Sequence, residues 1–326
     1  MRYVALIAVL AFAAACYSVS EVSYSNPQTT ANQWLIEFKP DEGKVYLTLS
    51  YRRAREKGGF NHSSTSFGIA FDQLSGLTRD QMMSSTGNVV HFQLKRDAGT
   101  FNLEGWFKDG NGSGHFTFSP SSSFAADLSR LEFGRATDEQ LQSLAMSDVG
   151  HTYINELKAQ GYDTTTIDQL VRMGNHGVEL EYLQELKALG YNVKTTDLIV
   201  RMKDHGVSVT FIRELMVLGY NEVTPEELIR TKDHGVNAKF INEFTAIGYD
   251  RASLNQWIRV KDHGVTPTFA KEIKEIGFSN VSLDQLVRLQ DHGVSASYIK
   301  RMKEKGYGDL TLEEYVRLKD RGERED

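Results

Sequence analysis

The chain has 326 residues, of which 40% are hydrophobic and 25% are charged, as in ordinary folded proteins. This composition excludes wholesale disorder, and the length allows two or three domains with a sizeable core. The net charge of −6 and the absence of a Lys/Arg cluster argue against a nucleic-acid partner.

The first residues have the pattern of a secretory signal peptide. Arg2 supplies a positive charge, and the apolar stretch from Tyr3 to Ala15 ends in small residues. This stretch is too short for a membrane span, and no later segment reaches about 18 apolar residues. We therefore expect residues 1–20 to direct export to the periplasm, the cell envelope or the outside of the cell. The mature chain is expected to have no membrane span.

The only cysteine, Cys16, follows three alanines. One interpretation is a bacterial lipobox, in which Cys16 becomes the lipidated first residue and serves as a lipid anchor. The alternative is that Cys16 is removed with the signal peptide or lies just beyond the cut. A single cysteine allows no disulfide within the chain, so stability must come from packing.

Residues 21–118 are expected to form a β-rich domain. Apolar and polar residues alternate from Trp34 to Phe38 and from Val45 to Leu49. Further strand-like runs are Phe67–Phe71, Val89–Leu94, Thr100–Phe107 and His115–Phe118. Asp97–Gly99 and the glycine-rich Asp109–Gly114 are predicted hairpin turns, and Thr78 with Gln81 predicts one short capped helix. The pattern indicates a small antiparallel sheet or sandwich of about six strands.

The C-terminal half repeats every 29 residues. The string His-Gly-Val recurs at His176, His205, His234, His263 and His292. A glycine followed by an aromatic residue keeps the same spacing at Gly161, Gly190, Gly219, Gly248, Gly277 and Gly306. Two marker columns in one register predict a true repeat.

Each unit is predicted to contain two short helices. In the third full unit, Phe211, Ile212 and Leu215 have helical spacing before Gly219, which fits a left-handed C′ position. Thr224 and Pro225 then fit the start of a second helix. One unit cannot bury enough surface alone, so we expect an all-α solenoid over residues 147–326, preceded by a degenerate capping repeat at 119–146. The expected fold class is α+β.

The five histidines admit two interpretations. As metal ligands they would form a ladder, but neighbouring helices pack about 8–10 Å apart whereas zinc–nitrogen bonds are about 2 Å long. One histidine per unit therefore cannot surround an ion. We favour histidines that cap carbonyls at helix C-termini and complement the negative end of the helix dipole.

A column of arginines also follows the repeat: Arg172, Arg201, Arg230, Arg259, Arg288 and Arg317. These arginines would form either a line of anion-binding sites or ion pairs that fix the two helices of each unit. The candidate partners are a glutamate column, Glu156 to Glu272, and an aspartate column, Asp204 to Asp320, three residues after the arginines. We favour the ion pairs because the carboxylates repeat in step.

No known catalytic motif occurs in the sequence, and we expect no cofactor and no catalytic residue. One alternative is a metal-dependent enzyme whose site gathers His62, His91 and His115 of the β-rich domain.

The markers Asp-His-Gly-Val and Leu-Gly-Tyr differ from the 34-residue tetratricopeptide pattern. They resemble uncharacterised repeats of exported bacterial proteins, and also the repeat extensions of sensor metallopeptidases of the beta-lactam-receptor type. The resemblance covers roughly Gly99 to Gly322 and includes the turn Arg96–Phe101. It implies a sensing or docking role only, since neither a zinc motif nor the spanning helices of those peptidases are present.

These patterns predict an exported, non-enzymatic binding or scaffold protein that holds a protein or peptide partner on a helical-repeat surface. The alternative is a regulatory or sensory module of an envelope protease or receptor system. Variable positions after His-Gly-Val are the predicted binding residues: Glu179, Ser208, Asn237, Thr266 and Ser295.

Overall fold

The computed structural model describes residues 32–39, 44–54, 60–250 and 252–322, except for the side chains of residues 52–62. The predicted signal peptide and Cys16 lie outside these residues. The chain divides into two compact units. The first contains the chain up to Phe71, Leu77–Val90 and Leu103–Phe116, and the second contains Asp72–Gly76, His91–Asn102 and the chain from Thr117 onward. The division therefore does not fall at one point near residue 118.

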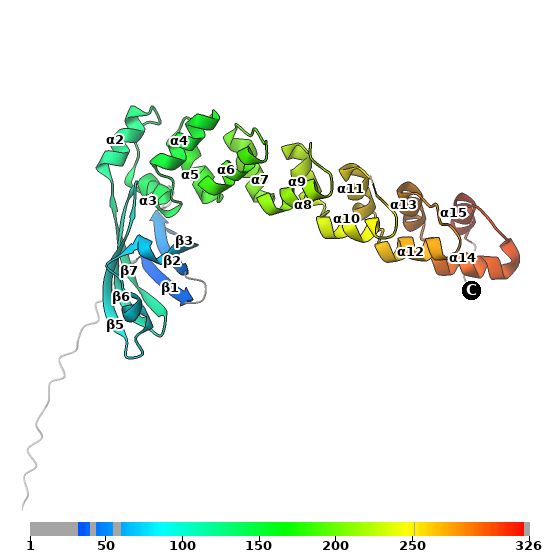
Figure 1. Ribbon diagram of the computed structural model, residues 1–326, viewed down its shortest axis with the longest axis horizontal. Helices are drawn as coiled ribbons and strands as arrows, with labels where there is room; N and C mark the ends of the chain where they lie inside the picture. The colour runs from blue at the N-terminus through cyan, green and yellow to red at the C-terminus, as the bar shows by residue number, and fades with distance from the viewer. Residues whose placement is uncertain (1–31, 40–43, 55–59, 251, 323–326) are drawn as a thin grey trace, which may run out of the picture. The chain divides into compact units, whose positions relative to one another are not determined.

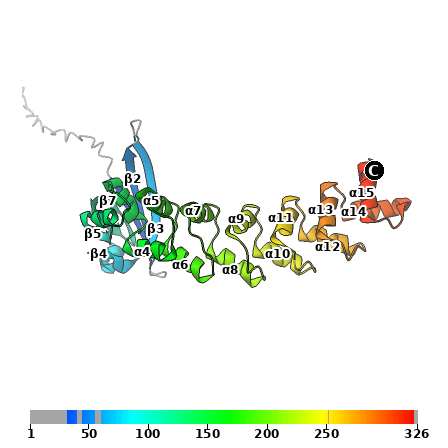
Figure 2. The ribbon, with the colours of Figure 1, turned by 90° about the horizontal axis from the view of Figure 1, so that it is seen from above.

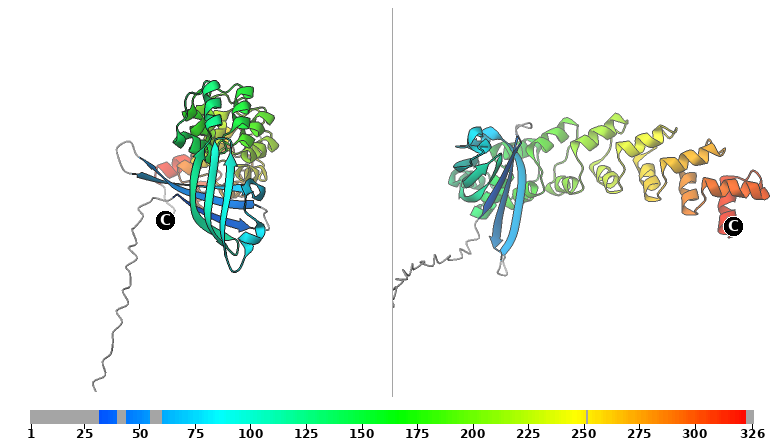
Figure 3. Two further views of the ribbon diagram at one scale, coloured as in Figure 1. Left: turned by 90° about the vertical axis from the view of Figure 1, so that its left-hand side faces the viewer. Right: turned by 90° about the horizontal axis from the view of Figure 1, so that it is seen from below.

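Seven strands form an antiparallel sheet in the order β3-β2-β1-β7-β6-β5-β4 (Figures 1 and 3). The strands are β1 (Gln33–Lys39), β2 (Lys44–Ala54), β3 (Phe60–Ala70), β4 (Leu74–Ser75), β5 (Asn88–Arg96), β6 (Gly99–Lys108) and β7 (Asn111–Pro120). A 3₁₀ turn, Phe71–Gln73, precedes β4, and the predicted helix α1 (Arg79–Met83) has Thr78 as its N-cap. The predicted α+β class is confirmed, with one more strand than expected.

The first unit has a core built on strand alternation. Trp34 and Ile36 of β1 are buried, whereas Leu35 between them is exposed. The Trp34 ring lies 5.4 Å from the Phe107 ring. Its indole N–H donates a hydrogen bond to the Glu104 carbonyl at 3.0 Å. The period-2 pattern therefore identified the buried face correctly.

The predicted turn at Asp109–Gly114 is wrong beyond Gly110. The turn takes only two residues, and β7 begins at Asn111. Gly114 is instead a site of close strand approach, because a Cβ there would lie 2.0 Å from the Glu104 carbonyl oxygen. At Gly112 a Cβ would lie 2.5 Å from the Phe107 ring. These glycines serve packing rather than a turn.

In the second unit, fourteen α-helices follow β7 within the described residues. They are α2 (Ser122–Arg130), α3 (Asp138–Met146), α4 (His151–Gln160), α5 (Ile167–Asn175), α6 (Leu180–Ala188), α7 (Thr196–Asp204), α8 (Val209–Val217), α9 (Pro225–Asp233), α10 (Ala238–Thr245), α11 (Leu254–Asp262), α12 (Pro267–Glu275), α13 (Leu283–Asp291), α14 (Ala296–Met302) and α15 (Leu312–Asp320). A π-helical turn, Lys303–Tyr307, follows α14.

The helix ends recur with the repeat. Thr224 accepts a hydrogen bond from the Glu227 amide at the start of α9, and the Glu227 side chain accepts one from the Thr224 amide. Gly219 and Gly235 have φ of 93° and 68°, the left-handed conformation that glycine tolerates best. Both predicted ends of α9 are therefore confirmed.

The helices contact one another in two series. Each odd-numbered helix from α3 to α13 contacts the next odd-numbered helix, and contacts between even-numbered helices run from α4 to α10 and from α12 to α14. Figure 2 shows the two rows. The predicted apolar columns lie between them, and Leu157, Leu186 and Leu215 are at most 2% exposed. Contact between like helices of consecutive units places the charged columns next to one another.

Candidate functional site

The histidine column forms pairs between consecutive units. His176 Nδ1 lies 2.6 Å from Oδ1 of Asp204, 28 residues further along the chain. Four further pairs follow: His205–Asp233, His234–Asp262, His263–Asp291 and His292–Asp320. Each of these histidines is the C-cap residue of its helix, as predicted. Its ring nitrogen contacts a carboxylate of the next odd-numbered helix, however, and not the predicted helix carbonyls.

The arginine column also joins consecutive units, through a partner 25 residues further on. Arg201 contacts both oxygens of Glu226, at 3.0 and 2.8 Å. The other pairs are Arg172–Asp197, Arg230–Asn255, Arg259–Asp284 and Arg288–Glu313. The last arginine, Arg317, lies 3.6 Å from Glu313 of its own helix. The predicted partners within one unit were therefore wrong, because these arginines reach the next odd-numbered helix.

Two residues of the predicted glutamate column pair along the even-numbered row. Glu185 lies 2.9 Å from Arg213 of α8, and Glu156 lies 3.5 Å from Lys187 of α6. These charges therefore also join neighbouring units, and each contributes little because the side chains are partly solvated.

A lysine column that the sequence reasoning missed lies over the buried aromatic column. Lys203 Nζ lies 4.7 Å from the Tyr182 ring centre, and Lys232 lies 4.9 Å from that of Phe211. Lys261 over Phe240 and Lys319 over Tyr298 repeat this contact. A lysine two residues before the histidine marker was the available signal. These lysines cover aromatic rings with their charge, a favourable cation–π arrangement.

The predicted binding residues are the N-cap positions of the even-numbered helices. The side chains of Ser208, Asn237, Thr266 and Ser295 accept hydrogen bonds from the amide three residues further on. Glu179 occupies the same position without a side-chain cap hydrogen bond. Their observed role is helix capping, and a role in binding stays a prediction.

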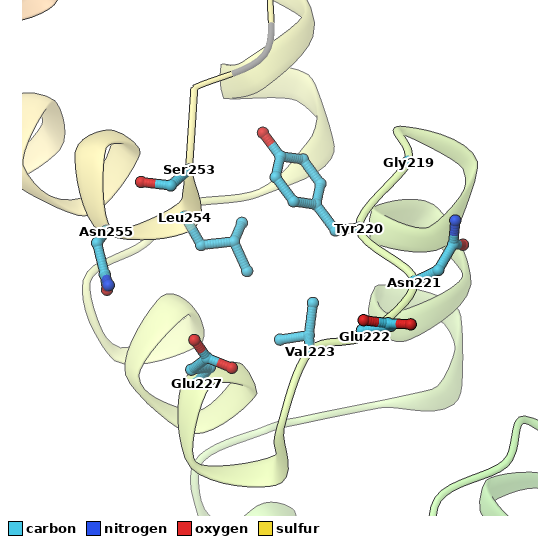
Figure 4. Close-up of a pocket in the computed structure, with 9 residues that line it drawn as sticks. All are labelled: Gly219, Tyr220, Asn221, Glu222, Val223, Glu227, Ser253, Leu254 and Asn255. Atoms are coloured by element: carbon cyan, nitrogen blue, oxygen red, sulfur yellow. The ribbon is translucent and has the colours of Figure 1, made fainter.

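A small notch occurs twice, at equivalent places two units apart. The first is lined by residues 219–223 of one unit and by Ser253, Leu254 and Asn255 of the next (Figure 4). The second is lined by residues 277–281, Thr311 and Leu312. Each notch therefore combines a glycine–aromatic loop with the start of the next odd-numbered helix.

The first notch has an apolar interior and a polar rim. Val223 and Leu254 face one another across it, beside the ring of Tyr220 (Figure 4). The Tyr220 hydroxyl donates to the Ala252 carbonyl at 2.7 Å and accepts from the Trp257 indole N–H at 2.7 Å. Burial raises the pKa of Tyr220, so the hydroxyl stays protonated and holds the wall in place.

Glu227, which also lines the first notch, is committed to its helix end. Hydrogen bonds from Thr224 lower the pKa of Glu227, so its carboxylate is charged at neutral pH. At the second notch the equivalent residue is the neutral Gln285. What the two notches share is therefore apolar and amide chemistry, not an acidic group.

The predicted metal alternative falls partly outside the description, because the side chain of His62 is among those not described. His91 lies on β5 and His115 on β7, in different compact units. Among the described residues, no three His, Cys, Asp or Glu side chains are grouped to hold a metal ion. No described helix combines the length and apolarity needed to cross a membrane.

Comparison with protein-family models, with curated proteins and with solved structures gives no match for this chain. The resemblance to repeat extensions of sensor peptidases therefore stays a prediction.

Proposed function

We propose that this chain is an exported, non-enzymatic binding or scaffold protein whose helical units form a solenoid that holds a protein or peptide. The observation that carries the proposal is the recurrence of one notch at residues 219–223 and 277–281. A site repeated along a row of units suits a ligand that is itself extended.

The chemistry of the notches suits a peptide. Val223 and Leu254 in the first notch, and Val281 and Leu312 in the second, offer apolar surface to a side chain. The rim residues Asn221 and Asn280 carry amides, which both donate and accept hydrogen bonds and so match peptide backbone groups.

The charged columns support a scaffold rather than a catalyst. Five histidines and five arginines of the odd-numbered row contact a polar side chain of the next unit. Side chains repeated in equivalent settings stabilise the junctions between units, and the surface that remains for a partner lies between them.

Site-specific photo-crosslinking tests the proposal. A photoreactive amino acid is placed at Asn221 or at Asn280, and the full chain is expressed with its envelope fraction. The control position is Val217, which is 86% exposed and outside both notches. We expect one common partner from both notch positions and none from Val217. Labelling that is absent, or equal at all three positions, would refute the proposal.

A further inference from the structure

The edge strand β3 of the first unit has no described strand on its outer side. It pairs with β2 alone, and it is the terminal strand in the sheet order. In an antiparallel pair, alternate residues direct their N–H and C=O groups away from the partner strand. The outer side of β3 therefore presents a row of backbone donors and acceptors (Figure 3).

β3 carries none of the features that usually block such an edge. It is 11 residues long and contains no proline, lysine, arginine, aspartate or glutamate. Its register with β2 runs without a bulge from Ala54↔Phe60 to Lys44↔Ala70. The strand at the other end of the sheet, β4, has only two residues and is protected by its shortness.

The face that β3 shares with β2 is lined by hydroxyl groups. Thr48 Oγ1 lies 2.7 Å from Ser66 Oγ, and Ser50 Oγ lies 3.2 Å from Ser64 Oγ. On the opposite face an apolar row remains incomplete at the edge: Leu47 is fully buried, while its β3 neighbour Phe67 is only half-buried. A further strand beside β3 would extend both rows.

We propose that two copies of this chain associate by antiparallel pairing of their β3 strands about Thr65. This register places Ser64 opposite Ser66 of the other copy and so repeats the hydroxyl pairs that already join β2 and β3. It brings no like charges together, because residues 63–70 are uncharged. One pair of strands buries less area than a standard stable interface, so the dimer is expected to be concentration-dependent.

The test is the oligomeric state of the full chain in a concentration series, measured by sedimentation or light scattering. The double variant Ser64→Lys, Ser66→Lys places lysines opposite lysines in the pair. We expect its dimerisation to weaken roughly tenfold or more.

The matched control is Ser113→Lys with His115→Lys. These residues lie in the same two cross-strand rows and on the same face, through Leu35 and Gln33, but on the interior strand β7. The control should dimerise as the unchanged chain does. Circular dichroism shows whether each variant is folded.

Hydrogen exchange supplies a second measurement. Amides of β3 should become more protected as the concentration of the unchanged chain rises. A chain that stays monomeric throughout, a dimer that both lysine variants form equally, or a dimer without protection of β3 would each overturn the inference.

Discussion

The His234 ring and the Asp262 carboxylate form a contact of 2.6 Å between α9 and α11. Asp262 is itself followed by His263, which contacts Asp291 in the same way. Each Asp-His pair therefore looks in both directions, with the aspartate received by the preceding unit and the histidine directed to the following one.

A double-mutant cycle should detect this coupling between units. We expect His234→Gln and Asp262→Asn to interact by about 0.2–1 kcal/mol, because both side chains are roughly two-fifths exposed and the pair is screened. Denaturation by urea measures the interaction. The matched cycle pairs His234 with Asp233, its neighbour in sequence, which contacts His205 instead. Equal coupling in the two cycles would contradict the observed pairing.

The pH dependence of stability should carry a contribution from His151. Its pKa is raised, chiefly by the hydrogen bond to Asp127 at 2.9 Å and further by Asp97. A raised pKa stabilises the fold below the ordinary value of about 6.5 and loses that effect as pH rises through the folded value.

We therefore expect the unchanged chain to exceed His151→Gln in stability by more at about pH 5.5 than at about pH 7.5, with a difference below about 1 kcal/mol because the ring is 45% exposed. Thermal melts at the two pH values measure it. A larger advantage at the higher pH would show that the sign is wrong.

Loss of a helix cap should destabilise the repeat. Thr224→Ala removes the side-chain oxygen that accepts from the Glu227 amide. We expect a cost of about 1 kcal/mol in the free energy of unfolding. Thr224→Ser keeps the hydroxyl and is the control. Similar losses in both variants would mean that the methyl group, and not the hydroxyl, matters here.

Two residues in the first helix pair should tolerate glycine well. Glu132 and Asp148 have φ of 68° and 54°, and both stand 29 residues before marker glycines, Gly161 and Gly177. Because side chains disfavour this conformation, Glu132→Gly should stabilise the chain by up to about 1 kcal/mol.

The reverse exchange, Gly161→Glu, should cost a similar amount. A Cβ at Gly161 meets nothing within 4 Å, so only backbone strain is introduced. Thermal melting of the two variants checks both signs. A stabilising Gly161→Glu would contradict the assignment.

The close approach of β6 and β7 should make Gly114 intolerant of any side chain. We expect Gly114→Ala to cost roughly 1–3 kcal/mol or more, because its Cβ would lie 2.0 Å from a backbone oxygen that cannot simply rotate away. Gly68→Ala is the control, since the nearest atom there is a Tyr46 ring carbon at 3.7 Å. Comparable melting temperatures for the two variants would argue against this strand crossing.

Sequence reasoning worked where the determining signal is local. The box of Thr224 with Glu227 and the glycines after each helix were readable because a helix end is specified by a few adjacent residues. The burial of Trp34 and Ile36 followed from alternation along one strand. The start of β3 was missed because its first half, rich in serine and asparagine, lacks that alternation.

The partners of the charged columns could not be read in the same way. Arg201 has Asp204 three residues later on its own helix, a spacing that also permits an ion pair. The choice of Glu226 depends on how far α9 lies from α7, which no single unit specifies. The paired notches escaped prediction for the same reason, because each is lined by residues of two units.

The constant offset of these pairs bears on how the protein can change in length. If one whole unit were lost, His205 would meet Asp262 where it now meets Asp233, and the junction would re-form with the same chemistry. Gain of a unit by duplication would likewise require no new complementary surface. Such a chain can be extended or shortened in 29-residue steps by recombination, while changes of any other size would misalign every junction they touch.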